Sequence, residues 1–187
     1  MQKLSMFNLV TLDGYFAGQG GDISWHMDAV DKEFHEFAVK NSSSGSTLIF
    51  GRVTYELMAS YWPSKDALKN DPIIAKGMNT SPKIVFSRTL KKADWANTRL
   101  VKDDMPGEIR KLKKQPGKGL TILGSGSIVA QLTEQGLIDE YQIMLVPIII
   151  GKGKTLFEGV KNKLLLKLTD SYTFGNGSVL LYYKSKN

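Results

Sequence analysis

The chain has no cysteine and only two histidines, and it lacks any long apolar run. Without cysteine it can form neither disulfides nor thiolate metal sites, and it has no thiol nucleophile. His26 and His35 are too few for a histidine-based metal cage unless carboxylates assist, so no metal site is predicted. The longest apolar run, Ile143–Ile150, is interrupted by Pro147 and falls well short of the roughly 20 residues that span a membrane. Because its start also lacks a signal-peptide pattern, the chain is expected to be cytoplasmic and to have no membrane partner.

The 187 residues carry a net charge of +7, with 42% hydrophobic and 23% charged residues. This composition is ordinary for a globular protein, and the length favours one domain, residues 1–187, over two small ones. A basic surface can attract nucleic acid, but the lysines are scattered and no Lys/Arg run alternates with aromatic residues. An anionic cofactor accounts for the charge at least as well, so a nucleic-acid partner is not expected.

Strand-like and helix-like segments alternate over the first 150 residues, and a hairpin pattern follows. Leu4–Leu12 and Tyr141–Ile150 are mostly apolar and fit buried strands, while Asn176-Gly177 is a strong hairpin signal. The other expected strands are Thr47–Phe50, Lys83–Ser87, Arg99–Lys102 and the apolar run from Leu120, and the expected helices are Ala29–Lys40, Val53–Tyr61, one starting near Asp104, and Ile128–Gln135. This order predicts an α/β fold with a mainly parallel central sheet, helices on both faces and an antiparallel C-terminal hairpin at the edge.

Three turns that each follow an apolar strand carry groups suited to binding phosphate. Gly124-Ser125-Gly126-Ser127 leads through Ile128 into a helix and leaves backbone N–H groups free at the helix start. Gly51-Arg52-Val53-Thr54 and Ser87-Arg88-Thr89 each place an Arg at a strand end, where its guanidinium can fork onto a phosphate. Ligands of open α/β sheets gather beyond the carboxyl ends of the strands, so the three turns together predict a nucleotide cofactor. Two converging Arg side chains suit the 2′-phosphate of NADPH better than the free ribose of NADH.

Each turn on its own also has an ordinary structural explanation. A glycine turn often does no more than bring a strand close to a helix. Arg52 could likewise be a surface residue beside a capping Thr54. The cofactor hypothesis therefore depends on the three turns acting together.

In their order and spacing, the segments resemble the dihydrofolate-reductase-like fold over nearly the whole chain. The closer resemblance is to the C-terminal reductase domain of the bacterial riboflavin deaminase–reductase. The motifs that carry it are Thr11-Leu12-Asp13-Gly14-Tyr15, Phe50-Gly51-Arg52-Val53-Thr54-Tyr55-Glu56, Val85-Phe86-Ser87-Arg88-Thr89, Leu123-Gly124-Ser125-Gly126-Ser127, and Leu137-Ile138-Asp139-Glu140 leading to Pro147 and Gly151-Lys152-Gly153.

This resemblance implies an eight-stranded sheet and NADPH as the cofactor. The adenosine end of NADPH would be held by Arg52, Thr54, Ser87 and Arg88. Gly124–Ile128 would cradle the pyrophosphate. Val10 and the Gly14–Gly21 loop would lie over the nicotinamide, and the loop could act as a lid. The hairpin would close one edge of the sheet, often at a dimer contact in this family, so a homodimer is expected.

Two departures from the family pattern bear on the substrate. Riboflavin-pathway reductases commonly carry Glu before the glycine pair, whereas this chain has Leu123, which argues against the riboflavin intermediate. Dihydrofolate reductases place an acid early in their first helix to hold the pteridine ring. Asp31 is the best match for that acid and Asp28 an alternative, so folate reduction is a minority interpretation.

Hydride transfer to a C=N or C=O bond also needs a proton at the neighbouring heteroatom, so a carboxylate is expected near the cofactor. Asp13, directly after the first strand, and Asp31 are the predicted catalytic acids, although a simple turn pair and a solvated first-turn acid explain them equally well. Trp25 and Phe34 could stack on a flat substrate, or they could belong to the core.

The sequence therefore predicts an NADPH-dependent reductase of a small flat heterocycle related to pterins, pyrimidines or flavins. A protein of the same fold that binds a nucleotide or metabolite without catalysis is the alternative, because Leu123 removes one expected polar group. A basic nucleic-acid-binding protein is a third and weaker hypothesis.

Overall fold

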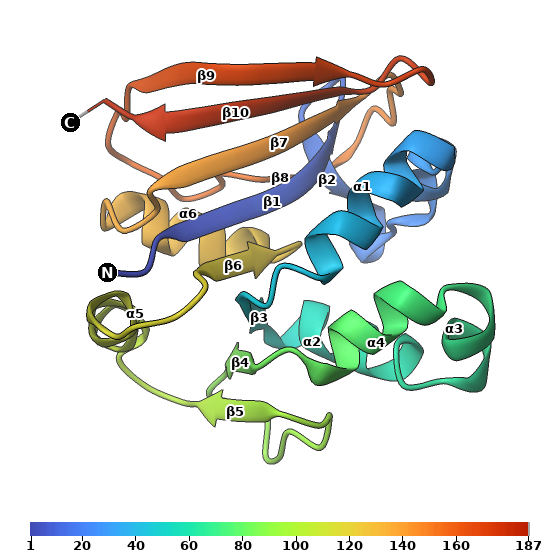
Figure 1. The fold of residues 1–187 in the computed structure, drawn as a ribbon. Helices are drawn as coiled ribbons and strands as arrows, with labels where there is room; N and C mark the ends of the chain where they lie inside the picture. Colours follow the sequence, from blue (N-terminus) through green and yellow to red (C-terminus); the bar gives the residue numbers. More distant parts are fainter. Residues whose placement is uncertain (187) are drawn as a thin grey trace.

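The computed structural model describes residues 1–186 and is built around an eight-stranded sheet. Its strands are β1 (Leu4–Thr11), β3 (Thr47–Gly51), β4 (Lys83–Phe86), β5 (Thr98–Val101), β6 (Leu120–Leu123), β7 (Glu140–Val146), β9 (Leu166–Thr173) and β10 (Val179–Ser185). They lie in the order β5-β4-β3-β6-β1-β7-β10-β9 (Figure 1). The first six run parallel to one another, whereas β10 runs antiparallel to both β7 and β9. The predicted mainly parallel sheet with an antiparallel hairpin at its edge is confirmed.

Helices connect the parallel strands and cover both faces of the sheet. They are α1 (Lys32–Ser42), α2 (Arg52–Tyr61), α3 (Lys65–Asn70), α4 (Pro72–Thr80), α5 (Met105–Lys114) and α6 (Gly126–Glu134). The chain moves from β1 through α1 to β3 in one direction along the sheet, and from β6 through α6 to β7 in the other. Because such crossovers are right-handed, α1 and α6 lie on opposite faces. None of the helices within residues 1–186 has the length and apolar composition needed to cross a bilayer.

Alternating side chains of β1 divide the core into two layers. Leu4 and Met6 belong to a buried cluster that also contains Leu132 of α6. Phe7 instead packs into the cluster on the α1 side, where its ring centroid lies 5.5 Å from that of Phe37. A strand buried on both faces in this way needs the nearly continuous apolar sequence that predicted it.

The segment between α2 and β4 contains two short helices that the sequence analysis did not predict. Buried side chains of α3 and α4, such as Ala67 and Met78, pack them against their neighbours. Lys83 at the start of β4 is almost fully buried, and its Nζ donates hydrogen bonds to the carbonyl oxygens of Met78 (2.8 Å) and Ser81 (2.7 Å). The ammonium also lies 4.5 Å from the ring centroid of Trp95. The lysine thus satisfies carbonyl groups at the end of α4 that have no partner within the helix.

A second, two-stranded sheet pairs β2 (Tyr15–Gly18) with β8 (Gly153–Thr155). The Gly14–Gly21 segment, which was expected to be a loop, therefore contains regular structure: Tyr15–Gly18 is a strand and Gln19–Gly21 forms a 3-10 helix, η1. The pairing joins segments more than 130 residues apart, so no local sequence pattern predicts it. It places β2 beside the end of β1 (Figure 1).

Two predicted boundaries also differ from the structure. Strand β7 ends at Val146 rather than Ile150, because Pro147 has no N–H to continue the ladder. Ala29 ends a separate 3-10 helix, η2 (Ser24–Ala29), and α1 begins only at Lys32.

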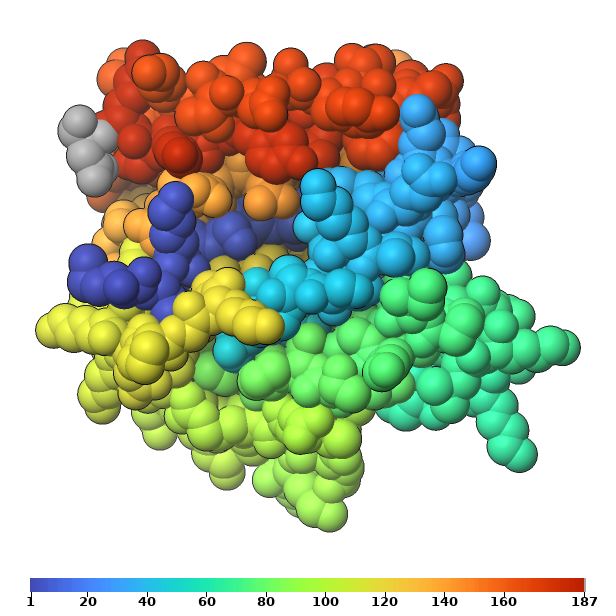
Figure 2. Space-filling view, viewed as in Figure 1, coloured from blue at the N-terminus to red at the C-terminus, as the bar shows by residue number. Residues whose placement is uncertain are grey.

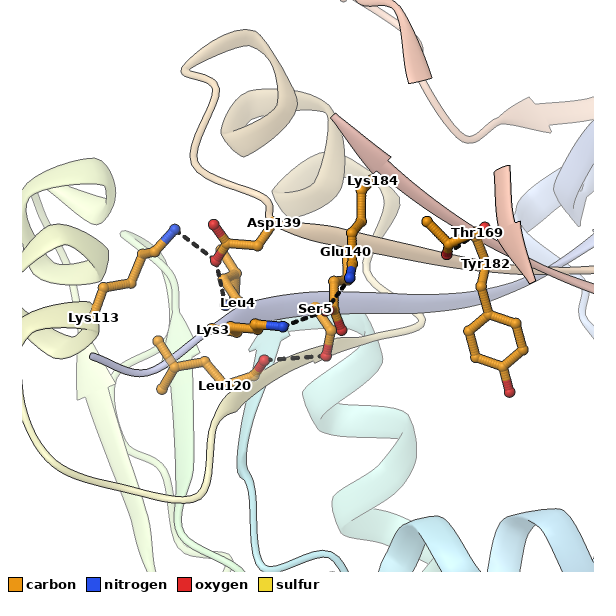
Figure 3. Close-up of polar contacts among 10 residues, drawn as sticks. All are labelled: Lys3, Leu4, Ser5, Lys113, Leu120, Asp139, Glu140, Thr169, Tyr182 and Lys184. Carbon is orange, nitrogen blue, oxygen red and sulfur yellow. Dashed lines mark hydrogen bonds and ion pairs between the residues drawn. The ribbon is translucent and has the colours of Figure 1, made fainter. Parts of the chain in front are cut away.

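Ion pairs close the amino edge of the parallel strands (Figure 3). Asp139 Oδ2 accepts hydrogen bonds from the Leu4 N–H (2.8 Å) and from Lys113 Nζ (2.7 Å). Glu140 pairs with Lys3 at 2.8 Å. The predicted phosphate-binding turns lie at the opposite, carboxyl edge.

The C-terminal hairpin forms one end of the molecule, at the top of Figure 2. Seven of the eight residues of β9 are exposed, including Leu168 and Tyr172. Because β9 is the last strand in the sheet, its outer backbone edge also has no neighbouring strand within residues 1–186.

Candidate functional site

Two of the three predicted phosphate-binding turns are joined by hydrogen bonds at the carboxyl edge of the sheet. Strands β3 and β6 are neighbours, so the β3–α2 and β6–α6 turns leave the sheet side by side. The Gly51 N–H donates to Ser125 Oγ at 2.9 Å, and Thr54 Oγ1 donates to the Gly124 carbonyl at 3.0 Å. The structure therefore brings together two segments that are about 70 residues apart in the sequence.

Glycine is needed where these turns approach each other. Gly124 has a φ of +64°, and a methyl group on it would lie 3.3 Å from Thr54 Cγ2. A methyl group on Gly51 would lie 3.3 Å from Ile128 Cγ1. Larger residues would push the turns apart. The glycines of both motifs are therefore needed for the contact between the turns, in addition to any role in binding a ligand.

The start of α6 keeps the features expected of an anion site. Ser125 occupies the N-cap position, but its hydroxyl accepts from Gly51 instead of capping the helix. The N–H groups of the first turn carry partial positive charge and have no side-chain cap. Val10, expected near the nicotinamide, is buried at the end of β1 in the same core cluster as Ile128.

The third turn follows β4, which is paired with β3 on the side away from β6. Ser87 Oγ accepts hydrogen bonds from the N–H groups of Thr89 (3.2 Å) and Leu90 (2.9 Å), so it organises its own turn. Arg88 is exposed. Arg52 Nη1 lies 2.7 Å from Glu56 Oε2, one helical turn further along α2. Both guanidinium groups thus come from strand ends on the same edge of the sheet.

Asp13 ties the β1–β2 turn to the segment that precedes β8. Its carboxylate accepts hydrogen bonds from Thr11 Oγ1 (2.6 Å), the Gly151 N–H (2.7 Å) and the Ile150 N–H (3.2 Å). The Thr11 hydroxyl, followed by these backbone groups, lowers the pKa of Asp13 below its usual value. Asp13 is therefore ionised at neutral pH and holds two loops of the candidate site together.

Asp31, the other predicted acid, is the N-cap of α1. Its Oδ1 accepts from the Phe34 N–H at 2.8 Å, and no hydrogen bond within residues 1–186 joins it to Asp13. Phe34 packs in the core cluster on the α1 face, 6.3 Å from Phe37 between ring centroids.

Trp25 is 5% exposed and borders a cavity of about 430 Å³ at this edge. The other lining residues are Gly18, Gln19, Asp22, Ile150, Gly151 and Lys152. They come from the β2–η2 segment and from the segment before β8, which Asp13 holds together. Gly18 and Gln19 belong to the Gly14–Gly21 segment that was predicted to lie over the nicotinamide, so the cavity borders that segment.

His26 lies next to Trp25 but does not line the cavity. Burial lowers the pKa of His26 to about 4, against a smaller opposing effect of its hydrogen bond to the backbone of Phe16. Its ring meets that of Trp25 edge-on with 4.2 Å between centroids, and its Nε2 is buried without a hydrogen-bond partner in the part of the chain that the structure describes. A lone histidine carries no sequence signal for such a position, because burial here depends on the fold of β2.

A family model places the chain among known proteins. The model of the RibD C-terminal domain matches residues 2–180. The chain belongs to this family. The predicted resemblance to the reductase domain of the riboflavin deaminase–reductase is therefore confirmed.

Individual relatives agree with this assignment. The chain is 32% identical over 174 residues to YyaP of Bacillus subtilis (strain 168), covering 93% of this chain and 90% of that protein. A solved structure from Shewanella sp. PV-4 has a TM-score of 0.75 at 23% identity and full coverage of both chains. Dihydrofolate reductase from Enterococcus faecalis, solved with NADP(H), has a TM-score of 0.63 at 14% identity, covering 99% of this chain and 97% of that one. The dihydrofolate-reductase-like fold is thus shown.

Proposed function

We propose that the protein is an NADPH-dependent reductase that transfers a hydride to a small flat heterocycle of the pterin, pyrimidine or flavin type. The observation that carries this proposal is the hydrogen-bonded junction of the two turns, Gly51 to Ser125 and Thr54 to Gly124. The junction joins a glycine-rich helix start to an arginine-bearing strand end, which is the donor set that a dinucleotide phosphate requires. Membership of the RibD C-terminal domain family supports a reductase.

The residues of the junction fit this cofactor. Gly124–Ile128 would bind the pyrophosphate through backbone N–H groups at the start of α6. The adenosine end, including its 2′-phosphate, would be held by Arg52, Thr54, Ser87 and Arg88. The Thr54 hydroxyl already donates to Gly124, so in this role it would accept a hydrogen bond from a ribose hydroxyl and would not contact the phosphate. When bound, NADPH supplies the hydride.

Asp13 and Asp31 remain our candidates for supplying the proton. Because its pKa is lowered, Asp13 would not be protonated at neutral pH. It would therefore act by relaying a proton from water to the substrate. Asp31 has one carboxylate oxygen bonded to Phe34, which leaves the other for a substrate or a water molecule. Asp13→Asn and Asp31→Asn variants separate these roles. The residue that supplies the proton sets the acidic or basic limb of the pH–rate profile, so replacing that residue should change this limb.

The substrate would enter the cavity that Trp25 borders. Its volume of about 430 Å³ suits a ring system of one or two rings rather than a large chain. Trp25 and Phe34 are the proposed aromatic contacts of the substrate. Trp25 lines the cavity, whereas Phe34 packs against the core cluster that contains Trp25 and is not a lining residue. Leu123 stands where riboflavin-pathway reductases commonly have Glu, so the substrate is expected to lack the group which that carboxylate would bind.

The test mixes the protein with NADPH and a panel of oxidised pterins, pyrimidines and flavins, and follows loss of the nicotinamide absorbance. Turnover of one class, with NADPH preferred over NADH, is the expected result. Tight NADPH binding without turnover of any compound would favour the alternative, a non-catalytic binding protein of this fold. No binding of either dinucleotide would contradict the proposal.

A further inference from the structure

Strand β1 carries an amide side chain on a face that is otherwise apolar. Asn8 lies between Met6 and Val10, at the two-residue spacing that keeps side chains on one face of a strand. Met6 and Val10 both belong to the buried cluster that contains the apolar residues of α6. The pairing of β1 with β7 shows no register shift from Ser5 to Thr11, so this alternation is unbroken. The Asn8 side chain therefore lies on the α6 face of the sheet.

The amide is buried without a partner for its oxygen. Asn8 is 3% exposed, and its Oδ1 accepts no hydrogen bond from any residue of the described range 1–186. An unsatisfied buried acceptor is unfavourable and therefore rare in folded proteins. Because an apolar side chain of similar volume would avoid this cost, packing alone does not explain an amide at this position.

Asn8 lies beside the glycine turn that leads into α6. In the parallel ladder, Phe7 pairs with Leu123, the last residue of β6. The next N–H group of that chain segment, from Gly124, donates to the Phe7 carbonyl at 3.1 Å. The chain then leaves the sheet and enters α6, so Asn8 is the first residue of β1 beyond the end of β6. Its amide thus lies where β6 ends and the helix begins.

This place lies between the two parts of the proposed cofactor site. Gly124–Ile128 form the proposed cradle for the pyrophosphate, and Val10 is expected at the nicotinamide. A dinucleotide that extends from one to the other passes Asn8. Between its pyrophosphate and its nicotinamide ring it carries ribose hydroxyls, and the ring carries a carboxamide. These groups offer the O–H or N–H donor that an amide oxygen needs, whereas an ionised phosphate offers none.

We propose that Asn8 binds the nicotinamide half of the dinucleotide, its Oδ1 accepting a hydrogen bond from a ribose hydroxyl or from the carboxamide N–H. The inference rests on the proposed NADPH function and adds a binding residue to that site. It also accounts for the unpaired amide, because the oxygen that lacks a partner among residues 1–186 gains one when the cofactor binds.

The test compares dinucleotide binding by the wild-type protein, Asn8→Leu and Asn8→Ala in calorimetric titrations. Loss of one hydrogen bond should raise the Kd for NADPH roughly 3- to 10-fold in both variants. The Kd for adenosine 2′,5′-bisphosphate should not change, because this compound lacks the nicotinamide half. An equal Kd for NADPH in all three proteins would overturn the inference while leaving the cofactor proposal intact.

Thr98→Val is the matched control. Thr98 Oγ1 is also buried without a hydrogen-bond partner in the described part of the chain, but it belongs to β5, at the far edge of the sheet. Its replacement likewise removes an unsatisfied polar atom. We expect it to leave the Kd values of both compounds unchanged.

Stability separates binding from a structural role of the amide. In Asn8→Leu an apolar side chain replaces an unsatisfied acceptor, so its urea midpoint should be at least as high as that of the wild type. Weaker NADPH binding that appeared only together with a lower urea midpoint in both Asn8 variants would show that the amide supports the fold. That result would overturn the inference.

The 3-acetylpyridine analogue of NADPH distinguishes the two possible donors, because its acetyl group has no N–H. If the carboxamide is the donor, the wild type and Asn8→Leu should bind this analogue equally well. If a ribose hydroxyl is the donor, the wild type should bind it more tightly. If the wild type bound neither NADPH nor the bisphosphate, the proposed function would fail, and this inference would fail with it.

Discussion

Arg52 and Arg88 are the two side chains whose charge distinguishes NADPH from NADH in the proposed site. Replacing either with Ala should remove a charge-assisted contact to the 2′-phosphate, worth about 1.5–3 kcal/mol. We therefore expect NADPH affinity to fall by roughly 10- to 150-fold while NADH affinity changes little. Calorimetric titration of both dinucleotides measures the two affinities.

Arg110→Ala is the control for this experiment, since Arg110 is an exposed arginine of α5. It removes the same charge from the whole protein without touching the carboxyl edge. Equal weakening of NADPH and NADH by the Arg52 and Arg88 variants would contradict the roles assigned to them.

His26 makes the stability of the fold depend on pH. Its pKa is about 4 in the folded protein, below the usual 6.5, because burial disfavours the charged ring. Between these two pH values the unfolded chain binds more protons, so acidification from pH 7 to pH 4 should lower the free energy of unfolding by about 2–3 kcal/mol. Urea unfolding at a series of pH values measures this slope.

The slope should shrink in His26→Gln, which cannot take up a proton. His35→Gln is the control, because His35 is exposed on α1. A wild-type stability that stays constant between pH 7 and pH 4 would show that His26 is not buried as described.

At the scale of elements, the buried Ser125 hydroxyl makes one of the two hydrogen bonds that join the β3–α2 and β6–α6 turns. Ser125→Ala would leave the Gly51 N–H without its acceptor. An unsatisfied buried donor costs about 1–3 kcal/mol, so we expect that loss in the free energy of unfolding together with weaker NADPH binding. Urea unfolding and dinucleotide titration of the same variant measure the two effects.

Ser127→Ala is the matched substitution, two residues further along and exposed. Its effect on stability should stay within about 0.5 kcal/mol. If Ser125→Ala were as stable as Ser127→Ala, the hydrogen bond to Gly51 would not hold the turns together.

Local patterns were enough to predict most elements of the sheet. The apolar run of β1, the Pro106 helix start of α5 and the turn at Gly177 each have a cause within a few residues of sequence. Helices α3 and α4 escaped prediction because they are short and their order comes from packing. Strand β2 escaped because its partner β8 is three residues long and distant in sequence.

The site was only partly predictable for the same reason. Glycine and arginine at strand ends pointed to the β3–α2 and β6–α6 turns, and the parallel sheet brings those turns together. The sequence proposed Asp13 and Asp31 as catalytic acids, but it could not show that Thr11 and backbone N–H groups already bind Asp13. His26 gave no signal, because its burial depends on the fold of β2.

At the scale of the whole molecule, the exposed hairpin is the expected homodimer surface. Leu168 of β9 is 49% exposed, next to a strand edge that no other strand of the described residues covers. We expect Leu168→Lys to shift the protein from dimer to monomer in sedimentation velocity, because a buried charge would replace an apolar contact. Leu68→Lys, at the same 49% exposure on α3, should leave the dimer unchanged.

A monomeric wild type at high concentration would contradict the dimer. It would not affect the proposed cofactor site, since no residue proposed for that site lies on β9.

The central claim is that two turns, distant in the sequence, bind one dinucleotide together. An NMR titration of the wild-type protein with NADPH tests it most directly. The account predicts that the amide signals of residues 51–54 and 124–128 shift together along a single binding curve. Shifts confined to one turn or to another part of the molecule, or no shifts at millimolar NADPH, would contradict it.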